Sequence, residues 1–221
     1  MTQAGPLQWI SGDGWLVLVG GRSAPGDLTE IDDRLLARAD FSRPIAFLPT
    51  AAGSWTGEAL LDQYAALGGP PGYVVPILAP ADAQDAENCQ MLAEAGLILI
   101  GDGDGLTLAR ALWDSRALAA MAEAFDQGAL IAGIGAGAAP LGEWIVAESD
   151  SAEGGPGWGW IRGAIVAPYF GGSAHSPLLP AVLRKHAGLV GLGIPTDVAL
   201  ALGPRGEVET WGEEVTVVVA H

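Results

Sequence analysis

Residues 129–142 have the pattern of a nucleophile elbow from which the nucleophile is missing. Residues 129–132 are apolar and predict a short buried strand, and the Gly- and Ala-rich residues 133–140 predict a sharp turn into a helix through Trp144. Such a turn needs small residues, because its central residue sits in strained backbone and its neighbours must not clash. Hydrolases place Ser or Cys at this centre, beside a base and backbone N–H donors. Here the centre is Gly135, so no covalent acyl-enzyme can form at this residue.

Three further loops are expected to meet the elbow at one edge of a sheet. They are Gly20-Gly21-Arg22, the segment 50–55 and the turn Gly101-Asp102-Gly103-Asp104-Gly105, and each follows an apolar strand. The carboxyl ends of parallel strands share one edge, where ligands of open α/β sheets bind. The sequence therefore predicts a cleft between these loops and the elbow.

Alternation of apolar and amphipathic stretches predicts the α/β class. Strands are expected at 15–19, 45–48, 73–77, 97–100 and 129–132. Helices are expected from Thr29, over 56–67, from Asp82, and on both sides of 114–115. Asp32 completes a capping box at the helix that begins after Thr29. This order predicts a three-layer, mainly parallel, doubly wound sheet within one domain, residues 1–221. The last third predicts strands at 161–166, 198–202, 208–211 and 215–219 and a helix over 177–186, as a small antiparallel extension.

Composition restricts the classes of partner and compartment. The chain has 221 residues and a formal net charge of −16, from 26 acids and ten cationic side chains. A field of that sign repels phosphate backbones, so we expect no nucleic acid partner, and it suits solubility or a cationic ligand. No apolar run reaches the roughly 18 residues of a membrane span, and no basic leader precedes the first strand, so a cytoplasmic protein without membrane contact is expected. Cys89 is the one cysteine, so an intrachain disulfide cannot form.

The order of the motifs resembles the cyanophycinase and aspartyl dipeptidase E family of serine peptidases. That family has Gly-Gly after the first strand, Pro-Thr-Ala after the second, a Gly-Gly-Asn/Asp-Gln/Thr turn after the fourth and a Gly-x-Ser-Ala-Gly-Ala-Ala elbow. The matching segments here are 20–21, 49–51, 102–105 and 133–139, and the resemblance extends from Trp15 to Val219. It implies a class I glutamine-amidotransferase-like fold and a tendency to form a homodimer.

The departures from the family pattern fall on its catalytic residues. The family serine aligns with Gly135, and the family histidine, in an Asp-x-His-Phe segment, aligns with Tyr169. Ala167 replaces the acid of that segment, Gly105 replaces the polar residue that ends the fourth-strand turn, and 171–175 replaces a substrate-binding Arg-Gly-Arg stretch. Tyrosine, with an ordinary pKa near 10, is a poor base at neutral pH. By resemblance the fold is kept and the Ser–His machinery is lost.

Individual residues are relevant to three other chemistries: a relocated Ser–His pair, dinucleotide binding and metal binding. His175 lies near Ser173 and Ser176 and could form a relocated Ser–His pair, although a solvated turn is the more common role for such residues. Gly133-x-Gly135-x-x-Ala138 satisfies a loose dinucleotide fingerprint, but it follows the fifth strand, and the acids about 20 residues on (Asp150 and Glu153) lie in a Gly-rich loop. No His, Cys and acid spacing suggests zinc, and Asp102 with Asp104 is too sparse for calcium, so no metal or cofactor is expected.

The eight tryptophans and the elbow together define the expected binding features. Trp55, Trp113, Trp158 and Trp160 lie near strand-end loops, where they either pack or offer a cation–π surface to a basic ligand. We predict a catalytically inactive relative of these peptidases that binds a small molecule, peptide or partner chain. The alternatives are a peptidase or amidase with a displaced nucleophile and a purely structural dimer subunit. The residues expected to bind are Gly21, Arg22, Gly103, Asp104, Gly105, Gly135, Ala136 and Tyr169, with an anion or small carboxylate between them.

Overall fold

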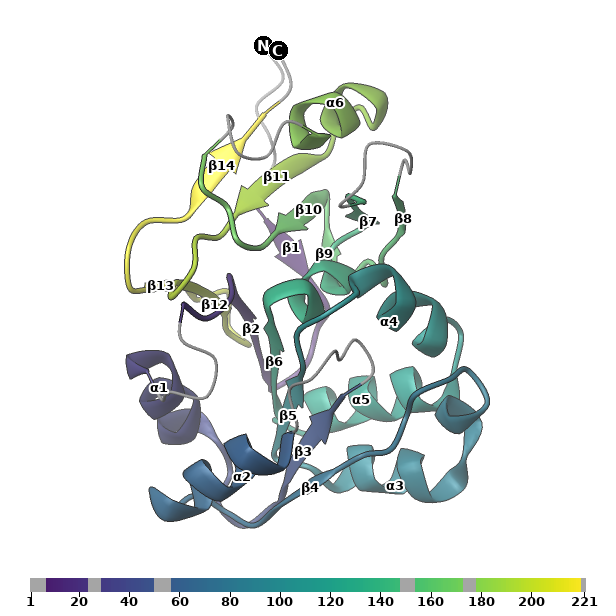
Figure 1. Cartoon of the computed structure of the whole chain (residues 1–221), viewed down its shortest axis with the longest axis vertical. Helices are drawn as coiled ribbons and strands as arrows, with labels where there is room; N and C mark the ends of the chain where they lie inside the picture. Colours follow the sequence, from purple (N-terminus) through teal and green to yellow (C-terminus); the bar gives the residue numbers. More distant parts are fainter. Residues whose placement is uncertain (1–6, 24–28, 50–56, 148–153, 173–177, 220–221) are drawn as a thin grey trace.

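A seven-stranded sheet forms the centre of the molecule (Figure 1). The computed structural model describes residues 7–23, 29–49, 57–147, 154–172 and 178–219. The strand order is β13-β12-β2-β6-β5-β3-β4, and five neighbouring strands run parallel: β2 (Trp15–Val19), β6 (Leu130–Ile134), β5 (Leu97–Ile100), β3 (Ile45–Leu48) and β4 (Gly72–Val74). Two antiparallel strands, β12 (Ala199–Leu202) and β13 (Val208–Trp211), extend the sheet beyond β2.

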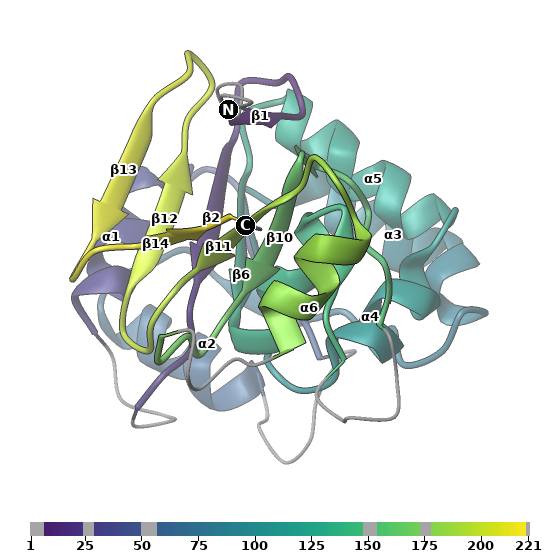
Figure 2. The same ribbon diagram turned by 90° about the horizontal axis from the view of Figure 1, so that it is seen from above.

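Helices cover both faces of this sheet (Figure 2). Successive side chains of a strand point to opposite faces, so Val17 and Val19 pack toward α1 (Glu30–Arg38) and α2 (Gly57–Ala66). Leu16 and Leu18 belong to the opposite core, with α3 (Ala86–Glu94), α4 (Gly105–Leu112) and α5 (Arg116–Asp126). Burial on both faces accounts for the uninterrupted apolar strands, and the predicted three-layer α/β class is confirmed. No helix in the described ranges is long and apolar enough to cross a membrane.

The last third of the chain builds a second, smaller sheet. It contains β10 (Ala164–Ala167), β11 (Val190–Gly193) and β14 (Thr216–Val218), with β10 and β11 parallel and β14 antiparallel to β11. Helix α6 (Leu178–Lys185) packs Leu179 and Leu183 in one cluster with Ile165 and Phe170. Two short ribbons complete the fold: β1 (Gln8–Trp9) with β9 (Ile161–Arg162), and β7 (Trp144–Ile145) with β8 (Gly155–Pro156).

The C-terminal extension is confirmed as antiparallel at β12 and β13 and differs elsewhere. Strand β14 leaves the main sheet for the second one, and the expected strand over 161–166 is split between β9 and β10. Strand β11 was not anticipated, because its sequence Val-Gly-Leu-Gly lacks the run of β-branched residues by which a strand is identified. Its pairing with β10 and β14 stabilises the extended backbone that the local sequence does not favour.

Helix starts were predicted with mixed success. The capping box at α1 is confirmed: the Thr29 hydroxyl accepts from the Ile31 N–H, and the Asp32 carboxylate accepts from the Thr29 N–H at 2.7 Å. Asp82 is not the cap of α3, because it begins a separate 3-10 turn, η1 (Asp82–Gln84). The cap is Asp85, whose carboxylate accepts from the first-turn N–H groups of α3.

The helix expected after the elbow is shorter and tighter than predicted. Residues Gly135–Leu141 form a 3-10 helix, η2, and Trp144 begins β7 instead of ending a helix. Pro140 lies inside η2 and has no N–H to donate, which disfavours a regular α-helix there. The turn nevertheless occurs where the sequence predicts it, directly after β6.

Candidate functional site

Gly135 lies at the carboxyl end of β6, between the parallel neighbours β2 and β5. This confirms the predicted strand-to-helix turn. The backbone φ of Gly135 is +55°, in the left-handed region where side chains are strained, as at the centre of a nucleophile elbow. A Cβ built on Gly135 would overlap the carboxylate of Asp102. The backbone geometry of the elbow is therefore present, but the space in front of it is filled.

The filling group is Asp102, which lies in the turn between β5 and α4 and was not among the predicted site residues. Its carboxylate accepts hydrogen bonds from the Gly103 N–H at 2.8 Å, from the Ala136 N–H at 2.7 Å and from the Tyr169 hydroxyl. Ala136 is the residue that follows the elbow centre and is one of the residues predicted to bind a ligand. These donors are therefore occupied by a carboxylate of the chain itself, and binding of an anion or small carboxylate ligand stays a prediction.

Tyr169 reaches this carboxylate from the segment after β10. Its φ is +53°, which is uncommon for a residue with a side chain, and its N–H donates to the Gly20 carbonyl at 2.6 Å. The ring lies against Gly21 so closely that a Cβ on Gly21 would overlap it. Tyr169 is 45% exposed. Its hydroxyl donates a hydrogen bond to Asp102 and therefore points toward the elbow.

Asp104 and Gly105 support the turn from β5 into α4. Asp104 is the N-cap: its carboxylate accepts from the Leu106 and Thr107 N–H groups at 2.9 and 3.1 Å and from the Thr107 hydroxyl. The hydrogen bond from the Thr107 side chain is the main cause that lowers the pKa of Asp104. Gly105 allows α4 to approach the elbow, because a Cβ there would lie 2.8 Å from the Ala136 carbonyl oxygen. Ligand binding by Asp104 and Gly105 stays a prediction.

Arg22 follows Gly21, but its side chain is buried in the protein interior. Its guanidinium donates to Asp32 in a bidentate pair, with 2.8 Å between Nη1 and Oδ2, and its side chain is only 6% exposed. Tyr64 donates its hydroxyl to the same carboxylate. Burial alone would raise the pKa of Asp32, but the Arg22 hydrogen bond and charge, followed by Tyr64, outweigh it and lower that pKa. The geometry gives Arg22 a structural role, and its role in ligand binding stays a prediction.

The tryptophans differ in whether they contact other side chains of the protein or are exposed. Trp15 and Trp211 flank the guanidinium of Arg38, which lies 5.1 and 4.9 Å from their ring centroids. The rings of Trp158 and Trp160 contact each other, with 5.9 Å between their centroids. Trp113 is 52% exposed. A cation–π surface for a ligand is therefore still a prediction for Trp113, and Trp55 lies outside the described residues.

Several other candidate residues lie outside the described ranges. These are the possible relocated Ser–His residues Ser173, His175 and Ser176, the whole of the 50–55 loop, and the acids Asp150 and Glu153. His186, just after α6, stacks on Trp144 with 4.1 Å between ring centroids. Within the described ranges no three His, Cys, Asp or Glu side chains gather as a metal site, and the expectation of a metal-free protein stays a prediction.

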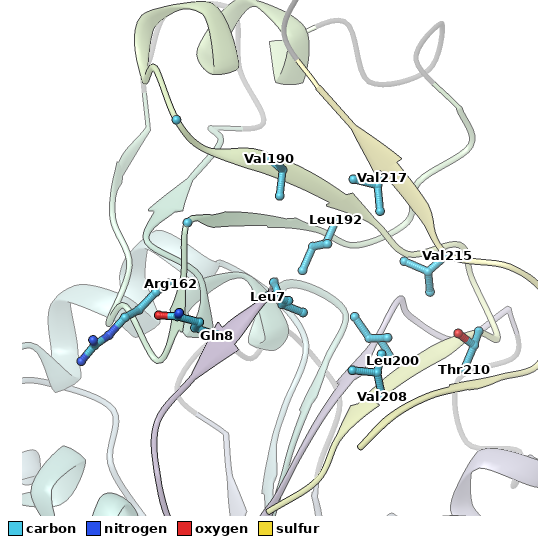
Figure 3. A pocket seen from close by; sticks show the side chains of 12 residues that line it. Leu7, Gln8, Arg162, Val190, Leu192, Leu200, Val208, Thr210, Val215 and Val217 are labelled. Atoms are coloured by element: carbon cyan, nitrogen blue, oxygen red, sulfur yellow. The ribbon is translucent and has the colours of Figure 1, made fainter. Parts of the chain in front are cut away.

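A cavity of about 570 Å³ lies between the two sheets (Figure 3). Apolar side chains from β11, β12, β13 and β14 and from Leu7 line it, and the Arg162 side chain points away from them. None of the predicted site residues is among its lining residues. This cavity is therefore distinct from the elbow and its surroundings.

Comparisons with known proteins agree with this architecture. Residues 16–205 match the family model described as Peptidase family S51. The chain is similar to the crystal structure of a peptidase from an acI-B1 Actinobacterium, with 22% identity, a TM-score of 0.74, and coverage of 95% of this chain and 96% of that one. It is also similar to a candidate peptidase E protein from Listeria monocytogenes EGD-e, with 14% identity, a TM-score of 0.62, and coverage of 91% and 99%. No curated protein sequence matches it.

Proposed function

Since the chain belongs to peptidase family S51, we propose that it is a non-catalytic member of that family which binds a ligand over the elbow cleft. The family turn between strand and helix is kept, with Gly135 at its centre. Hydrolysis through an acyl-enzyme needs a side-chain nucleophile beside a base, and the corresponding positions hold Gly135 and Tyr169. The protein keeps the scaffold of a peptidase without the groups that break the bond.

The observation that carries the proposal is the position of Asp102. In a working elbow, backbone N–H groups hold the oxyanion of the substrate. Here the Ala136 N–H donates to the Asp102 carboxylate at 2.7 Å. A substrate carbonyl would have to displace this internal anion, and no serine at residue 135 would then attack it. The cleft is therefore better suited to binding than to acyl transfer.

The charges around the elbow favour a cationic ligand over the predicted anion or small carboxylate. The carboxylates of Asp102 and Asp104 lie on the β5–α4 turn, and Asp197 donates its N–H to the Gly21 carbonyl at 3.0 Å. The half-exposed ring of Tyr169 lies beside Gly21 and offers a face for a cation. A second anion would meet like charges here, whereas an amine or guanidinium group would be attracted.

The test combines activity and binding on the purified protein. We expect no hydrolysis of aspartyl dipeptides or cyanophycin above background and no labelling by a serine-directed phosphonate. Arginine amide should raise the melting temperature of the protein and give a heat of binding in calorimetry. Succinate should do neither. Asp102→Asn should weaken arginine amide binding by about tenfold, the effect of losing one favourable charge contact of about 1.4 kcal/mol. Asp62→Asn, an exposed acid on α2, is the control of equal charge change.

Two outcomes would contradict the proposal in different ways. Stoichiometric phosphonate labelling at any serine would support the hydrolase with a displaced nucleophile. Equal weakening by Asp62→Asn and Asp102→Asn would show that arginine amide responds to net charge and has no site at the cleft.

A further inference from the structure

Asp102 joins three segments that are far apart in the sequence. Its own turn contributes the Gly103 N–H, the elbow contributes the Ala136 N–H 34 residues later, and the Tyr169 hydroxyl comes from 67 residues away. All three partners are donors, so they satisfy an ionised carboxylate and would not satisfy a hydroxyl or an apolar group equally well. The carboxylate is thus held in one orientation by groups on three sides.

The same carboxylate excludes a side chain at residue 135. The three atoms nearest to a Cβ built on Gly135 are Oδ1, Cγ and Oδ2 of Asp102. Aspartate is short, so its carboxylate moves away only if χ1 changes and the bonds to Ala136 and Tyr169 break. A side chain at residue 135 and the present orientation of Asp102 are therefore mutually exclusive.

We propose that Asp102 is an internal occupant of the elbow: its carboxylate takes the space that a nucleophile at residue 135 would require and the Ala136 N–H that would hold the substrate oxyanion. This inference rests on the proposed non-catalytic function. It adds a second obstacle to catalysis, besides the missing nucleophile. Serine at residue 135 and histidine at residue 169 do not by themselves rebuild the site, because the Asp102 side chain must also be replaced by a smaller one.

The first experiment is a double-mutant cycle on stability. Gly135→Ser should lower the melting temperature by about 4–8 °C more than the control Gly159→Ser. Gly159 has a similar φ of +67° but no atom within 4 Å of a built Cβ, so the control measures backbone strain alone. In an Asp102→Ala background, the extra loss caused by Gly135→Ser should fall below about 2 °C.

The Asp102→Asn background separates space from charge. Asparagine keeps the size of the side chain, so Gly135→Ser should remain as harmful there as in the natural chain. If Gly135→Ser fails to fold, Gly135→Ala replaces it, because the overlap already begins at Cβ. Equal losses for Gly135→Ser in the natural and Asp102→Ala backgrounds would overturn the inference.

The second experiment needs no change at the elbow itself. Removing the carboxylate leaves the Ala136 N–H without its partner, so Asp102→Ala should speed hydrogen exchange at that amide by about tenfold or more. Amides of β6 should keep their exchange rates, which controls for general loosening. An unchanged rate at Ala136 would refute the occupancy of the elbow by Asp102. Neither result depends on whether the natural protein is labelled by the phosphonate, so the two proposals can fail separately.

Discussion

Asp32 and Asp102 use similar hydrogen bonds in very different settings. Each carboxylate accepts one tyrosine hydroxyl and at least one backbone N–H, with Tyr64 serving Asp32 and Tyr169 serving Asp102. Asp32 is fully buried and forms an ion pair with the buried Arg22. Asp102 is half-buried, and no cation in the described part of the chain forms an ion pair with it.

This difference separates a carboxylate that supports the fold from one that shapes a cleft. A buried charge is tolerated only when it is paired and hydrogen-bonded, so Asp32 and Arg22 depend on each other. Asp102 keeps contact with water, so its removal should cost the fold little. The consequences of its removal should appear at the elbow, in the exchange of the Ala136 amide and in tolerance of a side chain at residue 135.

The largest effect is expected at the buried pair. Asp32→Asn removes the partner of Arg22 and should lower the free energy of unfolding by about 3–5 kcal/mol. Urea denaturation followed by circular dichroism measures this loss. Asp33→Asn, on the same turn of α1 but exposed, should stay within about 1 kcal/mol of the natural protein. Similar losses for both variants would mean that helix-terminal charge, rather than the ion pair, is what matters.

The contribution of Asp32 should also depend on pH in a defined direction. The folded pKa of Asp32 is lowered below its ordinary 3.8, so the folded state binds this proton less readily than the unfolded state. The stabilisation is fully present above the unfolded pKa and is lost as pH falls through the lower folded pKa. The stability gap between the natural chain and Asp32→Asn should therefore narrow in urea titrations below about pH 3.8. A gap that widened on acidification would contradict this sign.

The two tyrosines offer a matched pair with a smaller effect. Tyr64→Phe leaves a fully buried carboxylate short of one donor and should cost about 1.5–3 kcal/mol. Tyr169→Phe removes the same kind of hydrogen bond, but the ring is 45% exposed, so water can replace the hydroxyl and the cost should stay below about 1 kcal/mol. Urea denaturation of both variants gives the comparison. A larger loss at Tyr169 would assign the Asp102 cluster to the fold rather than to the cleft.

Much of the main sheet could be predicted because its signals are local. Strands β2, β3 and β5 begin and end at the predicted residues, since burial on both faces demands continuous apolar runs. The capping box at Thr29 and the turn at Gly135 were likewise read from adjacent residues. The cap of α3 was assigned to Asp82 instead of Asp85, because two acids three residues apart satisfy the same local pattern.

The site was harder to predict because its key contact joins distant residues. The sequence places Gly135 and Tyr169 as replacements for a serine and a histidine, and their positions relative to the sheet follow from that alignment. It places the turn that contains Asp102 near the elbow, but it has no signal that this carboxylate bonds to Ala136 and Tyr169, which are 34 and 67 residues away. An aspartate after a strand normally reads as a turn or cap residue.

The sequence by itself determined the α/β class, the elbow and the absence of a nucleophile side chain at residue 135, because each depends on residue type and short-range spacing. Only the tertiary structure decided which group fills the elbow and where Arg22 points. Both outcomes depend on side chains that the sheet brings together across loops, and a carboxylate takes whichever donors surround it. It was the fold that placed Asp102 in front of Gly135 and Asp32 beside Arg22.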